Sequence, residues 1–491
     1  MAAEPNVALA TLLKRLEGPL AVIGDRNRKV DAIEIDSRCV KPGALFVALR
    51  GRHTDGHRHA NDAAGKGARV VVVERAVDLP EDVTVVQVAD SRRALSVLAA
   101  AFYGDPSHAL DAIGVTGTNG KTTTTHMIAA VLNAGGISCG IAGTVGAEFR
   151  AHRWLLENTT PQPPELQRLL ARMRDAGANA VAMEVSSHAL ALDRVEDVRF
   201  RVAALTNVTR DHLDFHETIE AYAAAKRRLF SLAPACVINA DDKYGKRWES
   251  ELRREGRSVI TYGVRNAASL APEEIAVEPS GSRFTVNGQR YQLRLPGRFN
   301  IWNALAAIGV ARFLGVADAT GARALSELER VPGRMERFDA GEIAVVVDYA
   351  HTPDALANVL KTLRELEPQR LIAVFGCGGD RDRQKRPLMA EMADRLADYS
   401  IITSDNPRKE DPDAIVAEIE KGFRSNRYEK MVDRTQAIDR AVALARPRDI
   451  VLIAGKGHEN YQEFGDYTIP FDDIQIARRA IENHPVEFLS S

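Results

Sequence analysis

The sequence predicts an α/β protein, because short apolar runs of strand length alternate with amphipathic segments of helix length along most of the chain. Two further observations support this fold class. An apolar run at Ile113–Val115 leads through a turn rich in Gly and Thr into a segment with helical spacing, Thr122–Asn133. Beyond Arg334, four apolar runs each end in a polar cluster, which is typical of a doubly wound sheet.

Length and composition are those of a multidomain globular protein. The chain has 491 residues, which corresponds to about three domains. Hydrophobic residues make up 45% and charged residues 27%, and the net charge of −2 provides no field that would recruit nucleic acid or an anionic membrane. The four cysteines have no metal-ligand spacing, and neither a signal peptide nor a membrane span is predicted. We therefore expect a cytoplasmic protein without nucleic-acid or membrane partners.

Residues 1 to about 105 form the first predicted unit. Polar clusters at Asp36–Arg38 and Gly51–Gly56 lie in its predicted loops, where binding groups concentrate. Solvated turns explain the same composition equally well. Strands are expected at Ala32–Ile35, Leu45–Ala48, Val70–Val73 and Val83–Val88, and a helix at Ser91–Tyr103.

The turn that follows Val115 has the form of a phosphate-binding loop. Backbone N–H groups and the start of a helix favour a phosphate there, Lys121 adds a positive charge, and the Thr122 hydroxyl is suited to Mg²⁺. The first glycine of the general pattern falls on Val115, whereas Gly117 and Gly120 lie inside the turn. A glycine-rich turn with an incidental lysine is the alternative, but the strand–turn–helix context favours a nucleoside triphosphate site.

The second predicted unit continues to about Arg330. Asn287-Gly288 lies between two alternating runs and predicts a β-hairpin. A helix-rich segment is expected at Gly297–Leu314. The other expected elements are strands at Val181–Val185, Val202–Leu205 and Ala235–Ile238, and helices at Pro164–Ala176 and Ile219–Leu232.

Polar clusters at Glu184–His188 and Thr206–His212 follow two successive strands of this unit. Glu184 is suited to Mg²⁺ or to a metal-bound water. A lone histidine is more often structural, but two clusters at neighbouring strand ends beside a phosphate loop favour a metal–phosphate site. Lys226 lies in a predicted helix and, by composition alone, is a solvated charge.

The third predicted unit begins near Arg334. Arg381 and Arg408 suit carboxylates, because a guanidinium binds them bidentately, and Glu459 suits an ammonium group. A shared cleft for a zwitterionic, amino-acid-like ligand is the hypothesis, and ordinary solvated turns are the alternative. Strands are expected at Ile343–Val347, Leu371–Phe375, Ser400–Thr403 and Ile450–Ala454, followed by polar clusters at Asp348–Pro353, Phe375–Arg381, Ser404–Arg408 and Ala454–Glu459.

Together these motifs resemble the Mur ligases, ATP-dependent amide-forming enzymes of peptidoglycan synthesis, over nearly the whole chain. The segment Thr116–Thr122 is similar to the family's own phosphate loop, which accounts for the departure at Val115. Gly297–Asn303, Gly333–Glu336 and Asp348–His351 are similar to family segments that contact the nucleotide.

The resemblance implies a three-domain α/β fold. Residues 1–105 would form an N-terminal α/β domain that binds a UDP-sugar. Residues 106–333 would form a central ATP-binding domain with a parallel sheet of the P-loop ATPase type, and residues 334–491 a C-terminal Rossmann-like domain that binds an amino acid. ATP and two Mg²⁺ ions, small-molecule substrates and a monomeric state are also implied.

Individual residues take expected roles from the same resemblance. The expected ATP contacts are Gly117, Thr118, Asn119, Gly120, Lys121, Thr122, Thr123, Asn303, Arg334, Asp348 and His351. The expected UDP-sugar contacts are Ile35, Ser37, Arg52, His53, Thr54, Asn158, Thr159, Thr160, Ser186 and Arg194. Catalysis and metal binding are expected from Lys121, Thr122, Glu184, His212 and Lys226. Lys226 matches a family lysine that is carbamylated, which would make it an anionic oxygen ligand for a second Mg²⁺.

The segment Asp405–Arg408 resembles the version found in Mur ligases that add meso-diaminopimelate, whereas lysine-adding members lack the arginine. Arg408 would pair with the second carboxylate of diaminopimelate, which lysine does not have. The expected contacts of this amino acid are Arg381, Asp405, Asn406, Pro407, Arg408, Gly455 and Glu459.

The implied reaction has two steps. The γ-phosphate of ATP passes to the D-Glu side-chain carboxylate of UDP-N-acetylmuramoyl-L-Ala-D-Glu, and the amine of diaminopimelate then attacks the acyl phosphate. The alternatives are a lysine-adding Mur ligase, a folylpolyglutamate synthase, and a P-loop nucleotide-dependent binding module without ligase chemistry.

Overall fold

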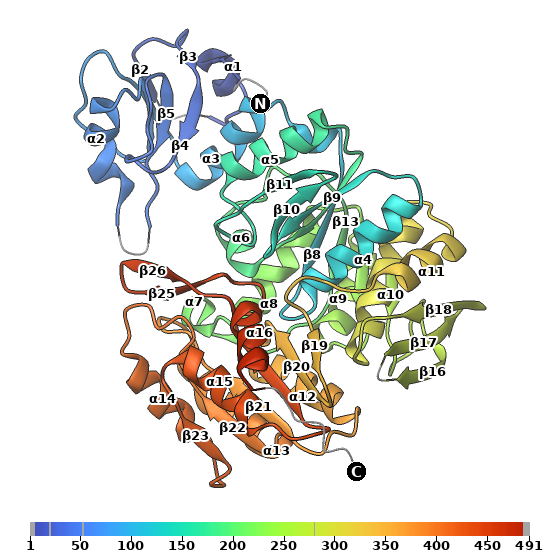
Figure 1. The fold of residues 1–491 in the computed structure, drawn as a ribbon. Helices are drawn as coiled ribbons and strands as arrows, with labels where there is room; N and C mark the ends of the chain where they lie inside the picture. Colours follow the sequence, from blue (N-terminus) through green and yellow to red (C-terminus); the bar gives the residue numbers. More distant parts are fainter. Residues whose placement is uncertain (1–4, 19–20, 52–53, 279, 485–491) are drawn as a thin grey trace. The chain divides into compact units, whose positions relative to one another are not determined.

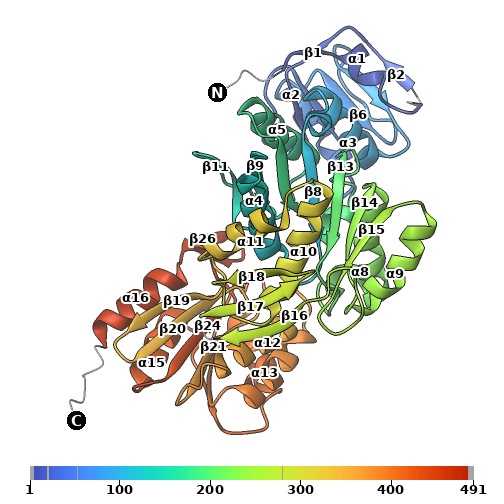
Figure 2. The same ribbon diagram turned by 90° about the vertical axis from the view of Figure 1, so that its right-hand side faces the viewer.

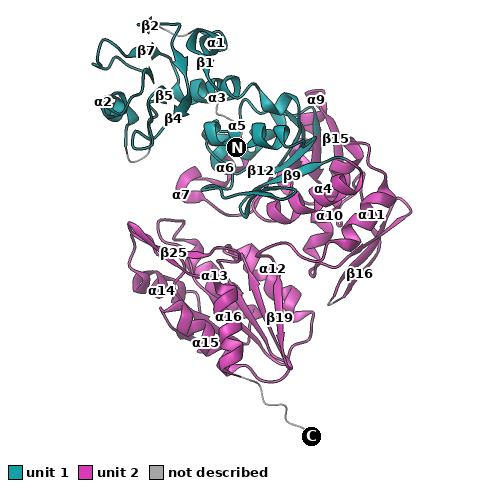
Figure 3. Cartoon of the chain, turned by 45° about the horizontal axis from the view of Figure 1, so that its top comes forward, with its two compact units in different colours: residues 1–114, 137–203, 225–235 teal, residues 115–136, 204–224, 236–491 magenta. Residues whose placement is uncertain are grey.

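The computed structural model describes residues 5–18, 21–51, 54–278 and 280–484 (Figure 1, Figure 2). The chain forms two compact units, which are coloured separately in Figure 3. One unit consists of residues 1–114, 137–203 and 225–235, and the other of residues 115–136, 204–224 and 236–491. No helix in the described ranges has the length and apolar character needed to cross a membrane.

A five-stranded sheet in the first unit has the strand order β2-β7-β6-β5-β4. Strands β4 to β7 run parallel, and β2 pairs antiparallel with β7. Along β6, Val70 and Val72 join one hydrophobic core while Val71 and Val73 join another, as in a strand buried on both faces. The strands are β2 (Ala21–Ile23), β4 (Ala32–Glu34), β5 (Ala44–Val47), β6 (Val70–Val73) and β7 (Thr84–Gln87).

Helices and a small ribbon complete this region. Strand β1 (Val7–Ala8) pairs antiparallel with β3 (Lys29–Val30). Each predicted strand of the region, and the predicted helix, is confirmed to within one residue at each end. The helices are α1 (Leu9–Leu13), η1 (Gly56–His59), α2 (Ala60–Gly65), α3 (Ser91–Phe102) and η2 (Pro106–His108).

An eight-stranded sheet has the order β11-β10-β9-β12-β8-β13-β14-β15. Strands β8, β13 and β14 each begin in the first unit and end in the second. The four strands predicted here are confirmed, whereas β9 to β11 and β15 were not predicted. The bounds are β8 (Asp111–Thr116), β9 (Cys139–Gly143), β10 (Gly146–Phe149), β11 (His152–Trp154), β12 (Ala180–Glu184), β13 (Phe200–Leu205), β14 (Ala235–Asn239) and β15 (Ser258–Tyr262).

The helices of the same part of the chain follow the predicted spacing with one correction. The helix predicted to reach Leu232 ends at Arg227, and a tighter 3₁₀ turn follows, as often occurs in the last turn of a helix. The helices are α4 (Lys121–Ala134), α5 (Pro163–Asp175), α6 (Ser187–Ala191), α7 (Leu213–His216), α8 (Ile219–Arg227), η3 (Arg228–Ser231), α9 (Lys243–Arg254), α10 (Phe299–Phe313) and α11 (Asp318–Glu327).

The predicted hairpin at Asn287-Gly288 is confirmed. It joins β17 (Gly281–Val286) to β18 (Gln289–Leu293), and β16 (Glu273–Glu278) completes a three-stranded antiparallel sheet (Figure 2). Asn287 and Gly288 have φ values of 48° and 80°, so both turn residues are left-handed, as a type I′ turn requires.

The C-terminal sheet has the order β19-β20-β24-β21-β22-β23. Its strands run parallel except for the antiparallel edge strand β19. Along β21, Leu371 and Ala373 pack with α12 to α14, while Ile372 and Val374 pack with α15 and α16. Helices therefore cover both faces, which confirms the predicted doubly wound arrangement. The strands are β19 (Glu336–Ala340), β20 (Ile343–Asp348), β21 (Leu371–Phe375), β22 (Tyr399–Ile402), β23 (Tyr428–Lys430) and β24 (Ile450–Ala454).

A short hairpin and five helices accompany this sheet. The predicted α/β class with parallel-rich sheets is confirmed over the described chain. The elements are α12 (Pro353–Arg364), α13 (Lys385–Leu396), α14 (Pro412–Glu420), α15 (Arg434–Leu444), β25 (Tyr461–Phe464), β26 (Tyr467–Pro470) and α16 (Asp473–Asn483).

Candidate active site

The phosphate loop connects β8 to α4 and depends on two glycines. Gly117 has φ 152°, and a Cβ added there would lie 1.8 Å from the Thr206 hydroxyl oxygen. Gly120 has φ 85°, and its Cβ would lie 2.5 Å from Asn303 Oδ1. Both positions therefore require glycine. The helix that follows begins at Lys121, where its dipole favours negative charge.

Lys121 folds back over this loop. Its Nζ donates to the carbonyl oxygens of Gly117 at 3.0 Å and Thr118 at 2.9 Å. The ammonium group is thereby held at the positive end of α4. The loop as a whole matches the arrangement that binds the phosphates of a nucleotide.

A cavity of about 450 Å³ opens beside the loop, within the size range of small-molecule sites. Six of the eleven expected ATP contacts line it, and they come from segments far apart in the sequence. These six residues are Asn119, Gly120, Thr123, Asn303, Arg334 and Asp348.

The cavity also contains a group that the sequence analysis did not identify. Trp302 donates from Nε1 to Asp241 Oδ2 at 2.8 Å, and the Arg265 guanidinium lies 5.6 Å from the Trp302 ring centre. Burial opposes ionisation of Asp241, but backbone N–H donors led by Val264 lower its pKa. An indole held in place beside a carboxylate suits a planar nitrogen-containing ring. Trp302 lies within the predicted nucleotide segment Gly297–Asn303, whereas no local sequence pattern pointed to Asp241 or Arg265.

Arg334 lies against the phosphate loop. Its Nη2 donates to the Thr122 hydroxyl oxygen at 2.8 Å. Nearby, the Met335 N–H donates to Asp348 Oδ2 at 2.8 Å, while burial raises the pKa of Asp348. Thr122 and Arg334, which belong to two separate predicted nucleotide motifs, are therefore in direct contact.

His351 is held as a neutral imidazole. Its Nδ1 lies 2.8 Å from the Tyr349 carbonyl oxygen, and because a carbonyl can only accept, Nδ1 carries the proton. Burial, with Lys385 nearby, lowers the pKa of His351. The Nε2 atom is left as a hydrogen-bond acceptor.

His212 lies beside a buried carboxylate that was not among the predicted residues. Its Nε2 is 3.3 Å from Asp211 Oδ2. Although burial opposes ionisation, His212 and Lys385 hold the pKa of Asp211 well below its usual range. Asp211 is therefore an ionised hydrogen-bond acceptor beside His212.

In the first unit, Glu184 is buried and precisely oriented by Thr144. The Thr144 N–H donates to Oε1 at 2.9 Å, and its hydroxyl donates to Oε2 at 3.0 Å. A Cβ on Gly143 would lie 2.3 Å from Glu184 Oε1, so this approach also requires glycine. The carboxylate is thus fixed at the end of β12, where the sequence predicted a polar cluster.

Three of the predicted UDP-sugar contacts lie together near Glu184. The Ser186 N–H donates to the Thr160 hydroxyl at 3.0 Å, and Arg194 Nη1 donates to the Thr160 carbonyl at 2.9 Å. Among the described residues Arg194 Nε has no hydrogen-bond partner, and burial lowers the pKa of Arg194 to about 10. A half-buried guanidinium of this kind is suited to an anion.

The remaining predicted UDP-sugar contacts lie on several segments. Ile35 and Ser37 follow β4 and are half-buried, whereas Thr54 is exposed and bonds His59 at 3.1 Å. Asn158 is exposed, and Thr159 lies 3.1 Å from the Thr144 hydroxyl. Arg52 and His53 lie outside the described residues.

Lys226 is buried, with 1% of its surface exposed, so the interpretation as a solvated helix charge is wrong. A lysine is rarely buried without a compensating group. Neither Lys226 nor any other described residue belongs to a preformed group of three or more His, Cys, Asp and Glu side chains suited to a metal. Mg²⁺ needs few protein ligands where phosphates and waters supply the rest.

Arg381 and Arg408 both approach Gly378, which lies in the loop after β21 of the C-terminal sheet. A Cβ on this glycine would lie 2.9 Å from Arg408 Nη1 and 3.6 Å from Arg381 Cγ. Partial desolvation and the charge of Arg408 lower the pKa of Arg381. Arg408 also donates to the Gly379 carbonyl at 2.9 Å and pairs with Glu463 at 2.9 Å. The Arg408 guanidinium and the Arg381 side chain therefore lie close together, and a guanidinium can bind a carboxylate through two parallel hydrogen bonds.

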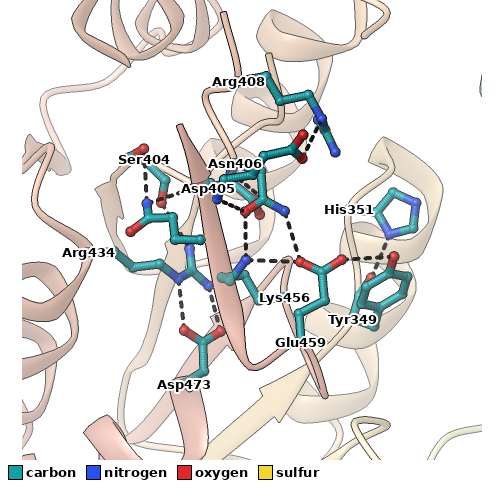
Figure 4. A network of polar contacts seen from close by, with 12 residues as sticks. Tyr349, His351, Ser404, Asp405, Asn406, Arg408, Arg434, Lys456, Glu459 and Asp473 are labelled. Carbon is teal, nitrogen blue, oxygen red and sulfur yellow. Dashed lines mark hydrogen bonds and ion pairs between the residues drawn. The ribbon is translucent and has the colours of Figure 1, made fainter. Parts of the chain in front are cut away.

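Beside them, the other predicted amino-acid contacts form a network with Lys456 (Figure 4). The Asn406 amide nitrogen donates to Glu459 Oε2 at 2.9 Å, and the Tyr349 hydroxyl donates to Oε1 at 3.3 Å. A Cβ on Gly455 would lie 2.6 Å from Asp405 Oδ2. Pro407 is buried in the same loop. The seven residues predicted for this pocket therefore lie in segments that meet at the carboxyl end of one sheet.

The fold and the phosphate loop define a P-loop nucleotide-binding protein of the α/β class. Residues 29–103 match the Mur ligase family catalytic domain, residues 115–311 the Mur ligase middle domain, and residues 333–457 the Mur ligase glutamate ligase domain. The chain belongs to the Mur ligase family, as its motifs predicted. It is therefore an enzyme of the ATP-dependent ligase class.

Relatives and solved structures agree with this family. The chain is 44% identical to the UDP-N-acetylmuramoyl-L-alanyl-D-glutamate--2,6-diaminopimelate ligase of Syntrophomonas wolfei, covering 96% of this chain and 98% of the relative. A solved structure of a ligase with the same name has 34% identity and a TM-score of 0.67, covering 97% of this chain and 99% of that one. Mycobacterium tuberculosis folylpolyglutamate synthase has 21% identity and a TM-score of 0.60, covering 74% of this chain and 92% of that one, which shows a shared fold alone.

Proposed function

We propose that this protein joins meso-diaminopimelate to the D-Glu side-chain carboxylate of UDP-N-acetylmuramoyl-L-alanyl-D-glutamate, using ATP. The observation that carries the proposal is the proximity of Arg381 and Arg408 at Gly378. The names of the relative from Syntrophomonas wolfei and of the 34%-identical structure contain UDP-N-acetylmuramoyl-L-alanyl-D-glutamate and 2,6-diaminopimelate, which supports the proposal.

The two arginines favour diaminopimelate over lysine for a physical reason. The distal end of diaminopimelate carries a carboxylate, whereas the distal end of lysine is an ammonium group alone. Two guanidinium groups attract the first and repel the second. A site built for a charged group also rejects an analogue that lacks it, because its own polar groups are left unpaired.

The nucleotide would bind along the cavity beside the phosphate loop. Its phosphates would lie on the backbone between Gly117 and Thr123, and Lys121 would offset the charge that develops during transfer. Its base would lie beside Trp302. The glycine-lined loop and the roomy cavity fit this ligand.

Mg²⁺ would neutralise charge on the transferring phosphate and orient it. Thr122, Glu184 and His212 would serve the metal ions, and Lys226 as a carbamate would support a second one. The donor set fits, since hydroxyl and carboxylate oxygens are the ligands Mg²⁺ prefers. Lys226 is buried, and carbamylation would replace its ammonium group with an anionic oxygen donor.

The chain's own groups would then guide two steps. The D-Glu carboxylate oxygen attacks the γ-phosphorus, the bond to the ADP oxygen breaks, and an acyl phosphate forms. The neutral amine of diaminopimelate then attacks the acyl carbon, phosphate leaves, and the amine loses a proton. Positioning of the three reactants supplies much of the rate enhancement. We assign the UDP-sugar to the predicted contacts, with Arg194 at an anionic group.

We further propose the domain boundaries 1–105, 106–333 and 334–491, a monomeric enzyme and a cytoplasmic location. A folylpolyglutamate synthase shares the fold, but the similarity covers only 74% of this chain.

Phosphate release tests the proposal. Reactions would contain ATP, Mg²⁺ and UDP-N-acetylmuramoyl-L-Ala-D-Glu, with meso-diaminopimelate, L-lysine or no amino acid. We expect release that depends on diaminopimelate. Equal release with lysine would contradict the role of the two arginines. Equal release without an amino acid would instead favour a nucleotide-dependent binding module.

A further inference from the structure

Lys456 is a buried cation that no predicted role explains. It follows β24 between Gly455 and Gly457, and its side chain has no exposed surface. Its Nζ donates to Asn406 Oδ1 at 3.0 Å and to Glu459 Oε2 at 2.9 Å. Because this ammonium group is fully enclosed, it cannot itself contact a ligand.

The two partners of Lys456 are themselves locked in place. Asn406 Oδ1 also accepts from the Glu463 N–H at 3.0 Å, and its amide nitrogen donates to Glu459 Oε2 at 2.9 Å. The orientation of the amide is therefore fixed by three contacts. Figure 4 shows the Lys456 ammonium group between the Asn406 and Glu459 side chains. One buried charge thus links two loops that the sequence separates by 50 residues.

The charges around Lys456 do not balance. The cations of the cluster are Lys456 and Arg434, and the anions are Asp405, Glu459 and Asp473. Arg434 forms a buried ion pair with Asp473 at 2.7 Å, so these two charges offset each other. Although burial opposes ionisation, Lys456 and Arg434 lower the pKa of Asp405, so it is ionised. Burial raises the pKa of Tyr349, which stays neutral. The adjacent Arg408 and Glu463 form an ion pair of their own. Among the five groups counted above, one negative charge is left over, which a bound ammonium group would offset.

We propose that Lys456 is a positioning residue for amino-acid recognition, holding the Glu459 carboxylate and the Asn406 amide so that this loop receives the substrate's ammonium group. Lys456 acts through Glu459, to which the Asn406 amide nitrogen also donates, and leaves the adjacent groups with one net negative charge. The inference rests on the proposed function, because it takes a zwitterionic amino acid as the ligand of this pocket.

A double-mutant cycle tests the proposal in the full-length enzyme. Lys456→Met keeps the aliphatic stem and removes the charge. We expect the KM for diaminopimelate to rise about 10- to 100-fold, the range for losing hydrogen bonds to a charged group. The KM values for ATP and for the UDP-dipeptide should change by less than about two-fold. Lys430→Met is the matched control, since Lys430 on β23 is exposed and pairs with Glu420 at 3.0 Å.

The second arm combines Lys456→Met with Glu459→Gln. Because Lys456 acts through Glu459, the double variant should have the same KM for diaminopimelate as Glu459→Gln alone. If the increases in the KM for diaminopimelate are additive in the double variant, the proposal is overturned. Equal rises of all three KM values in Lys456→Met, or an unchanged KM for diaminopimelate in that variant, would also overturn it.

The double variant also covers the case in which Lys456→Met fails to fold, because it removes the half-buried Glu459 carboxylate that Lys456→Met leaves without its cation. If the double variant also fails to fold, Lys456 has a structural role and the proposal is overturned. If the wild-type enzyme does not use diaminopimelate at all, the proposed function fails instead, so the two failures are distinguished in one assay.

Discussion

Arg334 donates a hydrogen bond to the hydroxyl of Thr122, and the same guanidinium lies 4.8 Å from the centre of the Tyr349 ring. It therefore connects the phosphate loop with the strand end that leads into the amino-acid pocket. The Thr122 hydroxyl is also the group proposed to bind Mg²⁺. Arg334 lies where the phosphates and the metal are expected.

Replacing Arg334 with alanine should weaken nucleotide binding. We expect the Kd for a non-hydrolysable ATP analogue to rise about 10- to 100-fold, because a charge-assisted contact to phosphate is lost. Isothermal titration would measure it. Arg337→Ala is the control, since Arg337 is exposed and pairs with Asp339 at 2.8 Å. An unchanged Kd in Arg334→Ala would remove this residue from the nucleotide site.

Replacing Gly117 with alanine should abolish nucleotide binding. The new Cβ would lie 1.8 Å from the Thr206 hydroxyl, and φ 152° is unfavourable for alanine. The loop would have to move, and its N–H groups would lose their alignment. The same titration checks this, with Gly65→Ala as a control because nothing lies within 4 Å of that Cβ. Normal binding by Gly117→Ala would show that this glycine is not needed.

Replacing Arg408 with alanine should alter the choice of amino acid. We expect kcat/KM for diaminopimelate to fall about 100-fold or more, because the second carboxylate loses its partner. The activity with lysine should not fall, because a charge that repels its distal ammonium group is removed, so the ratio of the two kcat/KM values is the decisive quantity. Lys409→Ala, an exposed neighbour, is the control. An equal loss with both amino acids would indicate a role unrelated to specificity.

His351 should make stability depend on pH. Its folded-state pKa lies below the usual value, so its contribution is fully present above about pH 6.5. As the pH falls below this value, the unfolded chain binds a proton that the folded chain does not, and stability is lost. His351→Gln keeps a donor for the Tyr349 carbonyl without titrating. Urea unfolding between pH 7.5 and 5 should show a shallower loss for this variant, and an identical loss would contradict the assignment.

Strands with strong local signals were predictable. Continuous apolar runs such as Val70–Val73 and Leu371–Phe375 fill two cores at once, so their composition alone identifies them. The Asn287-Gly288 turn was equally clear. Strand β9 was missed because its sequence, Cys-Gly-Ile-Ala-Gly, has few residues of high strand propensity. Strand β23 has only three residues and shows no alternation.

The site was predictable where its residues are contiguous. The phosphate loop and the Asp405–Arg408 segment each carry their chemistry within a few positions. The Asp241–Trp302 contact and the Arg434–Asp473 pair join residues about 60 and 39 positions apart, which no local pattern reveals. Burial of Lys226 and Lys456 is likewise set by tertiary packing, since a lysine in a polar sequence is ordinarily solvated.

The central claim is tested most directly by the mass of the product formed in a single competition reaction. The mixture would contain the enzyme, ATP, Mg²⁺ and UDP-N-acetylmuramoyl-L-Ala-D-Glu, with meso-diaminopimelate and L-lysine at equal concentration. We predict one product, with the mass of the diaminopimelate-containing tripeptide. A lysine-containing product as the main species would contradict the account of the arginine pocket, and the absence of either product would contradict the proposed ligase.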